Sequence, residues 1–173
     1  GLMLFDEPLG SLDATLRKEL RAELRMLQRE LGYTSISVTH DQEDALAVAD
    51  QVVVMRNGRM VQQGRPEDLY ARPRTAFVAS FFGDSNLIQG PDGLHVIRAE
   101  HVRLAGDGAP HPVELTVLDA EYRGRDYLVR GRPKQGDTTP LCFRMEARPR
   151  RGETLRVELP PEAMLPIVDD REA

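Results

Sequence analysis

Cysteine is nearly absent from this chain of 173 residues, which has Cys142 alone. An internal disulfide framework and a cysteine-rich zinc site are therefore both excluded. This usage fits a reducing compartment such as the cytoplasm. No base that could activate Cys142 can be identified in the sequence, so we do not expect it to act as a nucleophile.

Long apolar runs are lacking as well. No run approaches the ~20 residues that a membrane-spanning helix needs, and the N-terminal segment lacks the basic-then-apolar pattern of a signal peptide. The formal net charge is -5, which gives no overall attraction to nucleic acid. A composition that is 40% hydrophobic and 29% charged is typical of one ordinary globular domain or two small ones.

The first residues point to a longer protein. The chain opens at Gly1, without a methionine, and passes at once into the apolar run Leu2–Phe5. A domain seldom begins with a core strand and no lead-in. We therefore expect the chain to be a fragment.

The first half shows an α/β pattern. The run Leu2–Phe5 predicts a strand buried on both faces of a parallel sheet. Leucines at helical spacing predict a long helix that begins at the N-cap Asp13 and ends near Leu31. Further strands are expected over residues 35–39, 51–55 and 60–63, the last two joined by the Asn57-Gly58 turn, and shorter helices over 41–49, 66–70 and 75–82.

The composition changes between Gly83 and Gly93. Beyond this point, short β-like runs are separated by glycine and proline, a spacing that suggests a small all-β domain such as a barrel. These runs cover residues 95–104, 113–122, 127–130, 141–145 and 154–159. The sequence therefore predicts two domains, an α/β part over residues 1–83 and a β part over residues 84–173.

Asp6 and Glu7 directly follow the first predicted strand. At the carboxyl edge of such a strand, one carboxylate can hold Mg²⁺ and the next can polarise an attacking water. The alternative is that Asp-Glu-Pro merely ends a strand and begins a turn, where acidic residues are common.

His40 ends the next predicted strand of the same part. If both strands run in the same direction, His40 and Glu7 emerge at one edge of the sheet, where ligands of doubly wound sheets gather. A neutral imidazole there could contact a γ-phosphate or orient a water. The alternative is a surface or capping histidine.

Other polar residues have plain structural explanations. Asp13 suits a helix N-cap, and Ser11 suits a turn. The arginine row of the long helix, at residues 17, 21, 25 and 29, is typical of a solvated helix surface. The histidines at 95, 101 and 111 show no metal-ligand spacing.

Taken together, these segments resemble the ATPases of ATP-binding-cassette (ABC) transporters. Residues 2–8 resemble the Walker B motif, 9–13 the D-loop and 37–42 the H-switch. The segments 49–50, 57–58, 64–66, 75–79 and 82–83 resemble the end of importer ATPases of the sugar, polyamine, sulfate and ferric-iron group, and 97–104 a strand of their TOBE domain. The resemblance implies part of a P-loop NTPase (ABC ATPase) domain followed by a TOBE/OB-like β domain.

The resemblance also implies roles for individual residues. Asp6 would position Mg²⁺, Glu7 would be the general base or orient the water, and His40 would contact the γ-phosphate of ATP. Ser11 and Asp13 would lie across the interface of an ATPase homodimer. The implied partners are a second ATPase subunit, transmembrane permease subunits and, indirectly, a periplasmic-type solute-binding protein, with the ATPase peripheral to the cytoplasmic face of the inner membrane.

Three motifs of that family are not found in this sequence: the phosphate loop G-x-x-x-x-G-K-[ST], the Q-loop and the L-S-G-G-Q signature. We therefore expect the chain alone to be inactive, although the complete protein would be a transport ATPase. Two alternatives stay open. One is a regulatory, small-anion-binding or protein-interaction module built on the β domain. The other is a DNA-maintenance ATPase with a similar Walker B, against which the hairpin, the Phe77-Val78-Ala79 segment and the TOBE-like tail argue. The sequence does not name a transported solute.

Overall fold

The computed structural model describes residues 1–106, 108–109, 111–137 and 139–171. The chain divides into two compact units, Gly1–Arg72 and Pro73–Ala173. Among the described residues, no helix combines the length and the apolar character needed to cross a membrane.

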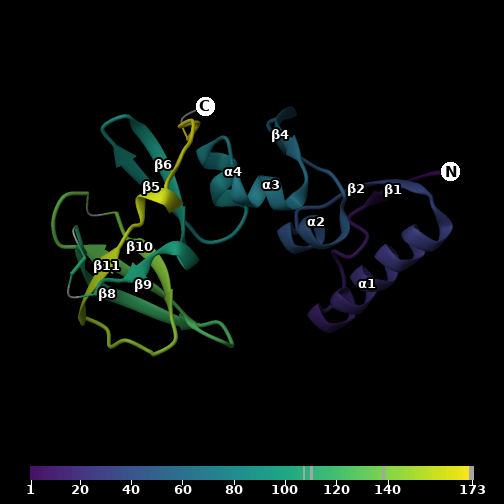
Figure 1. Cartoon of the computed structure of the whole chain (residues 1–173). Coiled ribbons are helices and arrows are strands. Elements are labelled where there is room, and N and C mark those ends of the chain that lie inside the picture. Colours follow the sequence, from purple (N-terminus) through teal and green to yellow (C-terminus); the bar gives the residue numbers. More distant parts are fainter. Residues whose placement is uncertain (107, 110, 138, 172–173) are drawn as a thin grey trace. The chain divides into compact units, whose positions relative to one another are not determined.

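The first unit alternates strands and helices (Figure 1). Its elements are, in order, β1 (Leu2–Asp6), α1 (Ala14–Leu31), β2 (Thr34–Val38), α2 (Gln42–Val48), β3 (Val52–Arg56), β4 (Arg59–Gly64) and α3 (Pro66–Ala71). Each strand and helix expected in this part of the chain is present.

β1 and β2 pair in parallel, with Leu2 opposite Thr34 and Asp6 opposite Val38. They form a two-stranded sheet, and the expectation that β1 is buried on both faces is wrong. Leu4 is 72% exposed and Ile36 is 55% exposed. The reason is that, among the described residues, β1 has β2 as its one hydrogen-bonded neighbour and no layer covers the apolar side chains of the pair.

α1 has well-formed ends. The Asp13 side chain accepts hydrogen bonds from the backbone N–H groups of Thr15 and Leu16, and Gly32 closes the helix in the left-handed conformation at φ 60°, as helix ends favour. No residue of α1 is buried, and Leu31 is 69% exposed. The leucine stripe is therefore present without a packed partner surface.

β3 and β4 form the expected hairpin. Asn57 and Gly58 both have positive φ, 51° and 74°, the geometry that a two-residue type I′ turn requires. Val52 and Val54 point to the buried face of the hairpin, which α3 covers through the fully buried Leu69. Gln62 donates a hydrogen bond to the Arg72 carbonyl, which fixes the chain after α3.

The second unit is built mainly of short antiparallel strands. Its elements are α4 (Ala76–Phe81), β5 (Ser85–Gly90), β6 (Gly93–Arg98), the 3₁₀ turn Ala99–His101, β7 (Arg103–Leu104), β8 (Val113–Tyr122), β9 (Tyr127–Pro133), β10 (Leu141–Met145), β11 (Thr154–Glu158), the 3₁₀ turn Pro161–Ala163 and β12 (Leu165–Pro166). The five-stranded sheet has the order β10-β9-β8-β11-β7, and the three-stranded sheet has the order β12-β6-β5.

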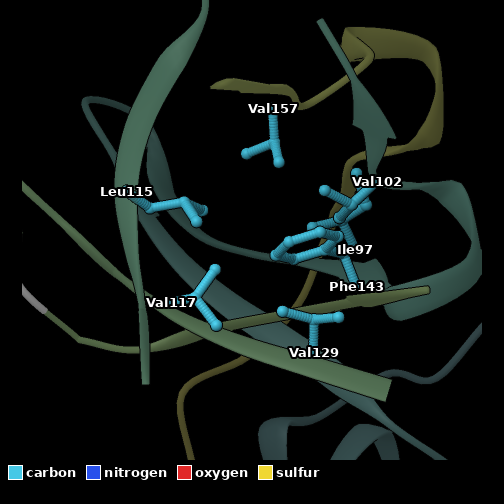
Figure 2. Packing of buried hydrophobic residues seen from close by; sticks show 7 residues of the cluster. All are labelled: Ile97, Val102, Leu115, Val117, Val129, Phe143 and Val157. Atoms are coloured by element: carbon cyan, nitrogen blue, oxygen red, sulfur yellow. The ribbon is translucent and has the colours of Figure 1, made fainter. Parts of the chain in front are cut away.

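The two sheets enclose the main core of this unit. Figure 2 shows its side chains converging from β6, the segment after it, and the strands of the larger sheet. The core residues are Ile97, Val102, Leu115, Val117, Val129, Phe143 and Val157, each at most 3% exposed. This barrel-like, all-β arrangement confirms the β part of the expected fold.

The segment before β5 packs with the second unit. Thr75 forms a bridge with Val168, and the Phe77 backbone N–H donates to the Asp170 side chain at 2.9 Å. Val78 and Phe82 are fully buried. The boundary expected from composition, between residues 83 and 84, therefore falls inside the second compact unit.

Candidate functional site

Glu7 and His40 meet at one edge of the β1–β2 pair. Because the strands are parallel, their carboxyl ends lie together, and the residue after each strand can reach the other. Glu7 Oε1 lies 2.7 Å from His40 Nδ1 and accepts a hydrogen bond from the His40 backbone N–H at 3.1 Å. The expectation that these two residues emerge at the same edge is confirmed.

The Glu7 backbone is strained. Its φ is 46°, a left-handed conformation that is uncommon for a residue other than glycine. The Glu7 N–H donates to the Val38 carbonyl at 2.9 Å, and the Glu7 carbonyl accepts from the Gly10 N–H at 3.1 Å. The strain therefore arises where the strand ladder ends and a tight turn begins, and strained residues of this kind cluster at functional sites.

The second carboxylate oxygen of Glu7 has no hydrogen-bond partner among the described residues, although it is buried. Gly10 lies directly against it, since a Cβ atom on Gly10 would be 3.4 Å from Glu7 Oε2. A buried carboxylate oxygen without a donor is costly. This oxygen is thus an acceptor available to a donor that enters the site, once the turn around Gly10 moves.

The His40 imidazole is mostly exposed, and its charge responds to Glu7. The hydrogen bond and the negative charge of Glu7 raise the pKa of His40, Asp41 raises it further, and desolvation and the Arg17 charge act in the opposite direction. The neighbouring Asp41 caps α2 by accepting from the N–H groups of Glu43 and Asp44. Although burial would raise the pKa of Asp41, these backbone donors and the charges of Arg21 and Arg17 lower it.

The other predicted site residues lie close by in the chain. Asp6 is exposed at the end of β1, and Ser11 is exposed in the turn that follows Glu7. The Asp13 carboxylate is engaged as the N-cap of α1, at 3.0 Å from the Thr15 nitrogen. The structure therefore brings Glu7 and His40 into contact and gives Asp13 the capping role that its sequence position also suggested.

The sequence-based prediction for the arginine row of α1, a solvated helix surface, was wrong for most of its members. Three of its members, Arg17, Arg21 and Arg25, turn toward α2 and bind it, so the expected solvated surface is wrong for them. Arg21 pairs with Asp41, Glu43 and Asp44, and its side chain is 13% exposed. The signal was available in the acidic cluster at positions 41, 43 and 44, which offers partners to arginines four residues apart.

The described residues fit a Mg²⁺ ion that is held mostly by phosphate and water. No group of three or more histidine, cysteine or acidic side chains that could cage a metal occurs among them. Mg²⁺ in nucleotide sites usually takes one or two carboxylates and completes its shell with phosphate oxygens and water. The exposed Asp6 carboxylate can supply such a ligand, and the unpartnered Glu7 oxygen lies one residue away.

The single cysteine of the chain lies in the second unit. Cys142 on β10 is half-buried, and burial together with the Asp84 charge raises the pKa of its thiol to about 11. A thiol that stays protonated is a poor nucleophile, which agrees with the expectation that Cys142 does not act as one. Asn86 joins the two sheets instead, because it accepts from the Cys142 N–H at 2.6 Å and donates to the Cys142 carbonyl at 2.8 Å.

Comparison with known protein families identifies part of the chain. Residues 95–167 match the family model described as the TOBE domain. This range covers most of the strands of the barrel-like unit, from β6 to β12.

Curated relatives match about half or more of the chain at high identity. A spermidine/putrescine import ATP-binding protein, PotA, from Bacillus thuringiensis (strain Al Hakam) is 48% identical over 103 residues, which are 60% of this chain and 32% of that protein. The PotA protein of Acetivibrio thermocellus is 56% identical over 89 residues, 51% of this chain and 25% of its own length. That of Trichormus variabilis is 48% identical over 103 residues, 60% of this chain and 26% of that protein.

These matches confirm the resemblance found in the sequence. The matched part of this chain spans about a quarter to a third of the length of these curated relatives.

Proposed function

We propose that this chain is part of an ABC importer subunit that binds and hydrolyses ATP to drive solute uptake. The match to the TOBE domain and the similarity to import ATP-binding proteins support this proposal. The observation that carries the proposal is the contact between Glu7 and His40 at the carboxyl ends of two parallel strands. In this reading the first unit is part of a P-loop NTPase domain.

The chemistry assigns each residue a different task. A bound Mg²⁺ would supply positive charge that offsets the negative charge developing on the transferred phosphoryl group. Asp6 would supply a carboxylate ligand to that ion. Glu7 would accept a proton from the attacking water or orient it, and His40 would donate a hydrogen bond to the γ-phosphate. Ser11 and Asp13 would face the second ATPase subunit of a homodimer.

The two carboxylate oxygens of Glu7 are placed differently. Its Oε1 pairs with His40, and its Oε2 is buried against Gly10. The G-x-x-x-x-G-K-[ST] loop, whose N–H groups and lysine hold phosphates, does not occur in this sequence. This chain by itself would therefore be inactive, and turnover would require the full-length subunit.

The partners follow from the proposed role. The subunit would pair with a second copy and with transmembrane permease subunits at the cytoplasmic face of the inner membrane, and a solute-binding protein would act with the permease. Because the named relatives are spermidine/putrescine import proteins, spermidine and putrescine are the first solutes to test.

We assign the second unit to regulation or subunit pairing, because the proposed catalytic groups all precede it. Binding of a small anion is the weaker alternative for this unit. Of the arginines that could attract one, Arg123 is paired with Glu121 at 3.0 Å, and Arg130 and Arg132 are exposed side chains on β9. Exposed, scattered arginines are the norm on protein surfaces.

The test is the Glu7→Gln substitution in the full-length subunit. We expect ATP binding to persist while turnover falls about 10²- to 10⁴-fold, the usual cost of losing a positioned base. Removal of one negative charge also reduces repulsion of the γ-phosphate, so the ATP-bound dimer should persist longer. Nucleotide binding, steady-state phosphate release and size-exclusion chromatography with ATP measure the three effects.

Two further substitutions separate the roles. Asp6→Asn should raise the Mg²⁺ concentration that is required for half-maximal activity, and His40→Ala should lower turnover. Normal hydrolysis by Glu7→Gln would show that the assignment of Glu7 is wrong.

A further inference from the structure

Arg17 joins the two turns that carry the site residues. These are the Glu7 turn, residues 7–13, and the His40 turn, residues 39–41. The guanidinium donates through Nη1 to Asp41 Oδ2 at 2.7 Å and through Nη2 to the Leu12 carbonyl at 3.0 Å. Asp41 directly follows His40, and Leu12 lies in the turn that covers Glu7. One planar group thus binds both turns.

Asp41 transmits this contact to the backbone around His40. Its Oδ1 accepts from the N–H groups of Glu43 and Asp44 at 2.8 and 3.1 Å, and its own N–H donates to Thr39 Oγ1 at 3.0 Å. The Asp41 carboxylate is therefore fixed on one side by the first turn of α2 and on the other by Arg17. A shift of Arg17 would release the His40 turn from the Glu7 turn.

We propose that Arg17 is a positioning residue, which holds the Glu7 turn against the His40 turn and so keeps Glu7 and His40 in the relative placement that hydrolysis requires. This inference rests on the proposed ATPase function. Arg17 contacts neither Glu7 nor His40 in any hydrogen bond of the described residues, and it acts through Leu12 and Asp41.

The neighbouring arginines distinguish positioning from simple helix packing. Arg21 binds Asp41, Glu43 and Asp44, and Arg25 binds the Ala47 carbonyl, so both attach α1 to α2. Among the described residues, the added bond to the Glu7 turn is made by Arg17. Its Nε is moreover buried without a hydrogen-bond partner, an arrangement that opposes stability. Packing of α1 on α2 alone therefore does not explain its placement.

The first experiment compares three substitutions in the full-length subunit. Arg17→Gln should lower kcat for ATP at least ~10-fold while KM stays within about 3-fold, because small displacements of catalytic groups mainly affect the chemical step. Arg17→Lys should restore part of kcat, since one ammonium group cannot reproduce the two-pronged guanidinium geometry. Arg25→Gln, the matched control on the same row, should keep both constants near wild type.

A double substitution tests whether Arg17 acts through Glu7. If it does, Arg17→Gln should add little further loss to Glu7→Gln, because groups that act as one unit are strongly non-additive. An independent, full further loss would overturn the inference. So would a raised KM with an unchanged kcat in Arg17→Gln.

The pKa of His40 gives a readout besides activity. Loss of the Arg17 charge alone would raise the pKa of His40, because that cation lowers it. Loss of positioning would break the hydrogen bond that Glu7 accepts from His40 and would lower the pKa of His40. We expect a lower pKa of His40 in Arg17→Gln, measured by NMR titration, and a rise would refute the positioning role even if the variant has little activity.

The outcomes separate this inference from the proposed function. If Glu7→Gln hydrolyses ATP normally, the function and the inference both fail. If Glu7→Gln is slow and Arg17→Gln has the kcat of the wild type, the inference alone fails.

Discussion

At the scale of single residues, the charge of His40 is set by one contact. The hydrogen bond and the negative charge of Glu7 raise the pKa of His40 above its ordinary value. A raised pKa in the folded state means that the contact contributes stability fully at pH values below the ordinary histidine pKa. That contribution is lost as the pH rises through the raised value.

The corresponding prediction concerns Glu7→Gln. An amide cannot supply the negative charge, so the pKa of His40 should fall back toward its ordinary value of about 6.5. NMR titration of the histidine ring protons in the full-length subunit measures this shift. An unchanged His40 titration would show that the two side chains do not interact in solution.

The site was only partly predictable at this scale. Glu7 and His40 could be placed together because each follows an apolar strand, and parallel strands end at one edge. The role of Arg17 could not be predicted, since helical spacing says which residues share a face and does not say what that face meets. The strained φ of Glu7 also depends on the turn geometry and leaves no signature in the residue type.

At the scale of elements, local sequence signals predicted where the β3–β4 hairpin and the helices form. They predicted less well which residues of these elements are buried. Asn57-Gly58 predicted the β3–β4 turn, and Asp13 and Gly32 predicted the ends of α1. The apolar run of β1 predicted a strand correctly and its burial wrongly, because burial depends on elements that pair with it from elsewhere. In the second unit most strands followed from short β-like runs, but β5 and β12 lie outside the expected runs. The hydrogen bonds of Asn86 between the two sheets had no local signal either.

A glycine on β9 tests how closely β8 and β9 pack. A Cβ atom on Gly131 would come closer to Leu115 Cδ1 than real Cβ atoms come to their neighbours, and Leu115 is fully buried. Gly131→Ala should therefore destabilise the second unit by about 1–3 kcal/mol, the usual cost of overpacking. Urea unfolding of the full-length subunit, followed by a probe in the second unit, measures the change.

Gly106 offers the matched control. A Cβ atom there would meet nothing within 4 Å, so Gly106→Ala should be close to neutral. Equal stability of the Gly131→Ala and Gly106→Ala proteins would contradict the close packing of β8 and β9.

At the scale of the whole molecule, the two units differ in how completely their apolar side chains are buried. The second unit encloses its core residues, whereas Leu4, Ile36 and Leu31 of the first unit are more than half exposed. Exposed apolar strands favour association with other chains. This contrast supports the proposal that the first unit completes its packing with other parts of a longer subunit.

The first prediction at this scale is that the purified 173-residue chain does not hydrolyse ATP. The lack of a phosphate-loop pattern in this sequence leads to this expectation. A steady-state phosphate-release assay with and without Mg²⁺ tests it. Mg²⁺-dependent turnover that disappears in Glu7→Gln would refute it.

The second prediction at this scale concerns where the full-length subunit can be truncated. Truncation after Arg72 removes the whole second unit, whereas truncation after Gly83 leaves α4 and the buried residues Val78 and Phe82 without the rest of that unit. We expect basal ATPase activity to survive truncation after Arg72, with altered pairing or regulation. The protein that ends at Gly83 should aggregate more, as measured by light scattering. Loss of hydrolysis in a folded protein that ends at Arg72 would refute the proposal that the second unit takes no part in catalysis.

The bridge between Thr75 and Val168 closes the second unit on itself. Two hydrogen bonds hold this closure, from the Ala76 N–H to the Val168 carbonyl and from the Val168 N–H to the Arg74 carbonyl, each 2.9 Å long. Adjacent entry and exit points are what allow a domain to be inserted into a surface loop of another protein. We therefore expect that residues 73–171 could be inserted into a surface loop of a host protein without separating the two ends of that loop.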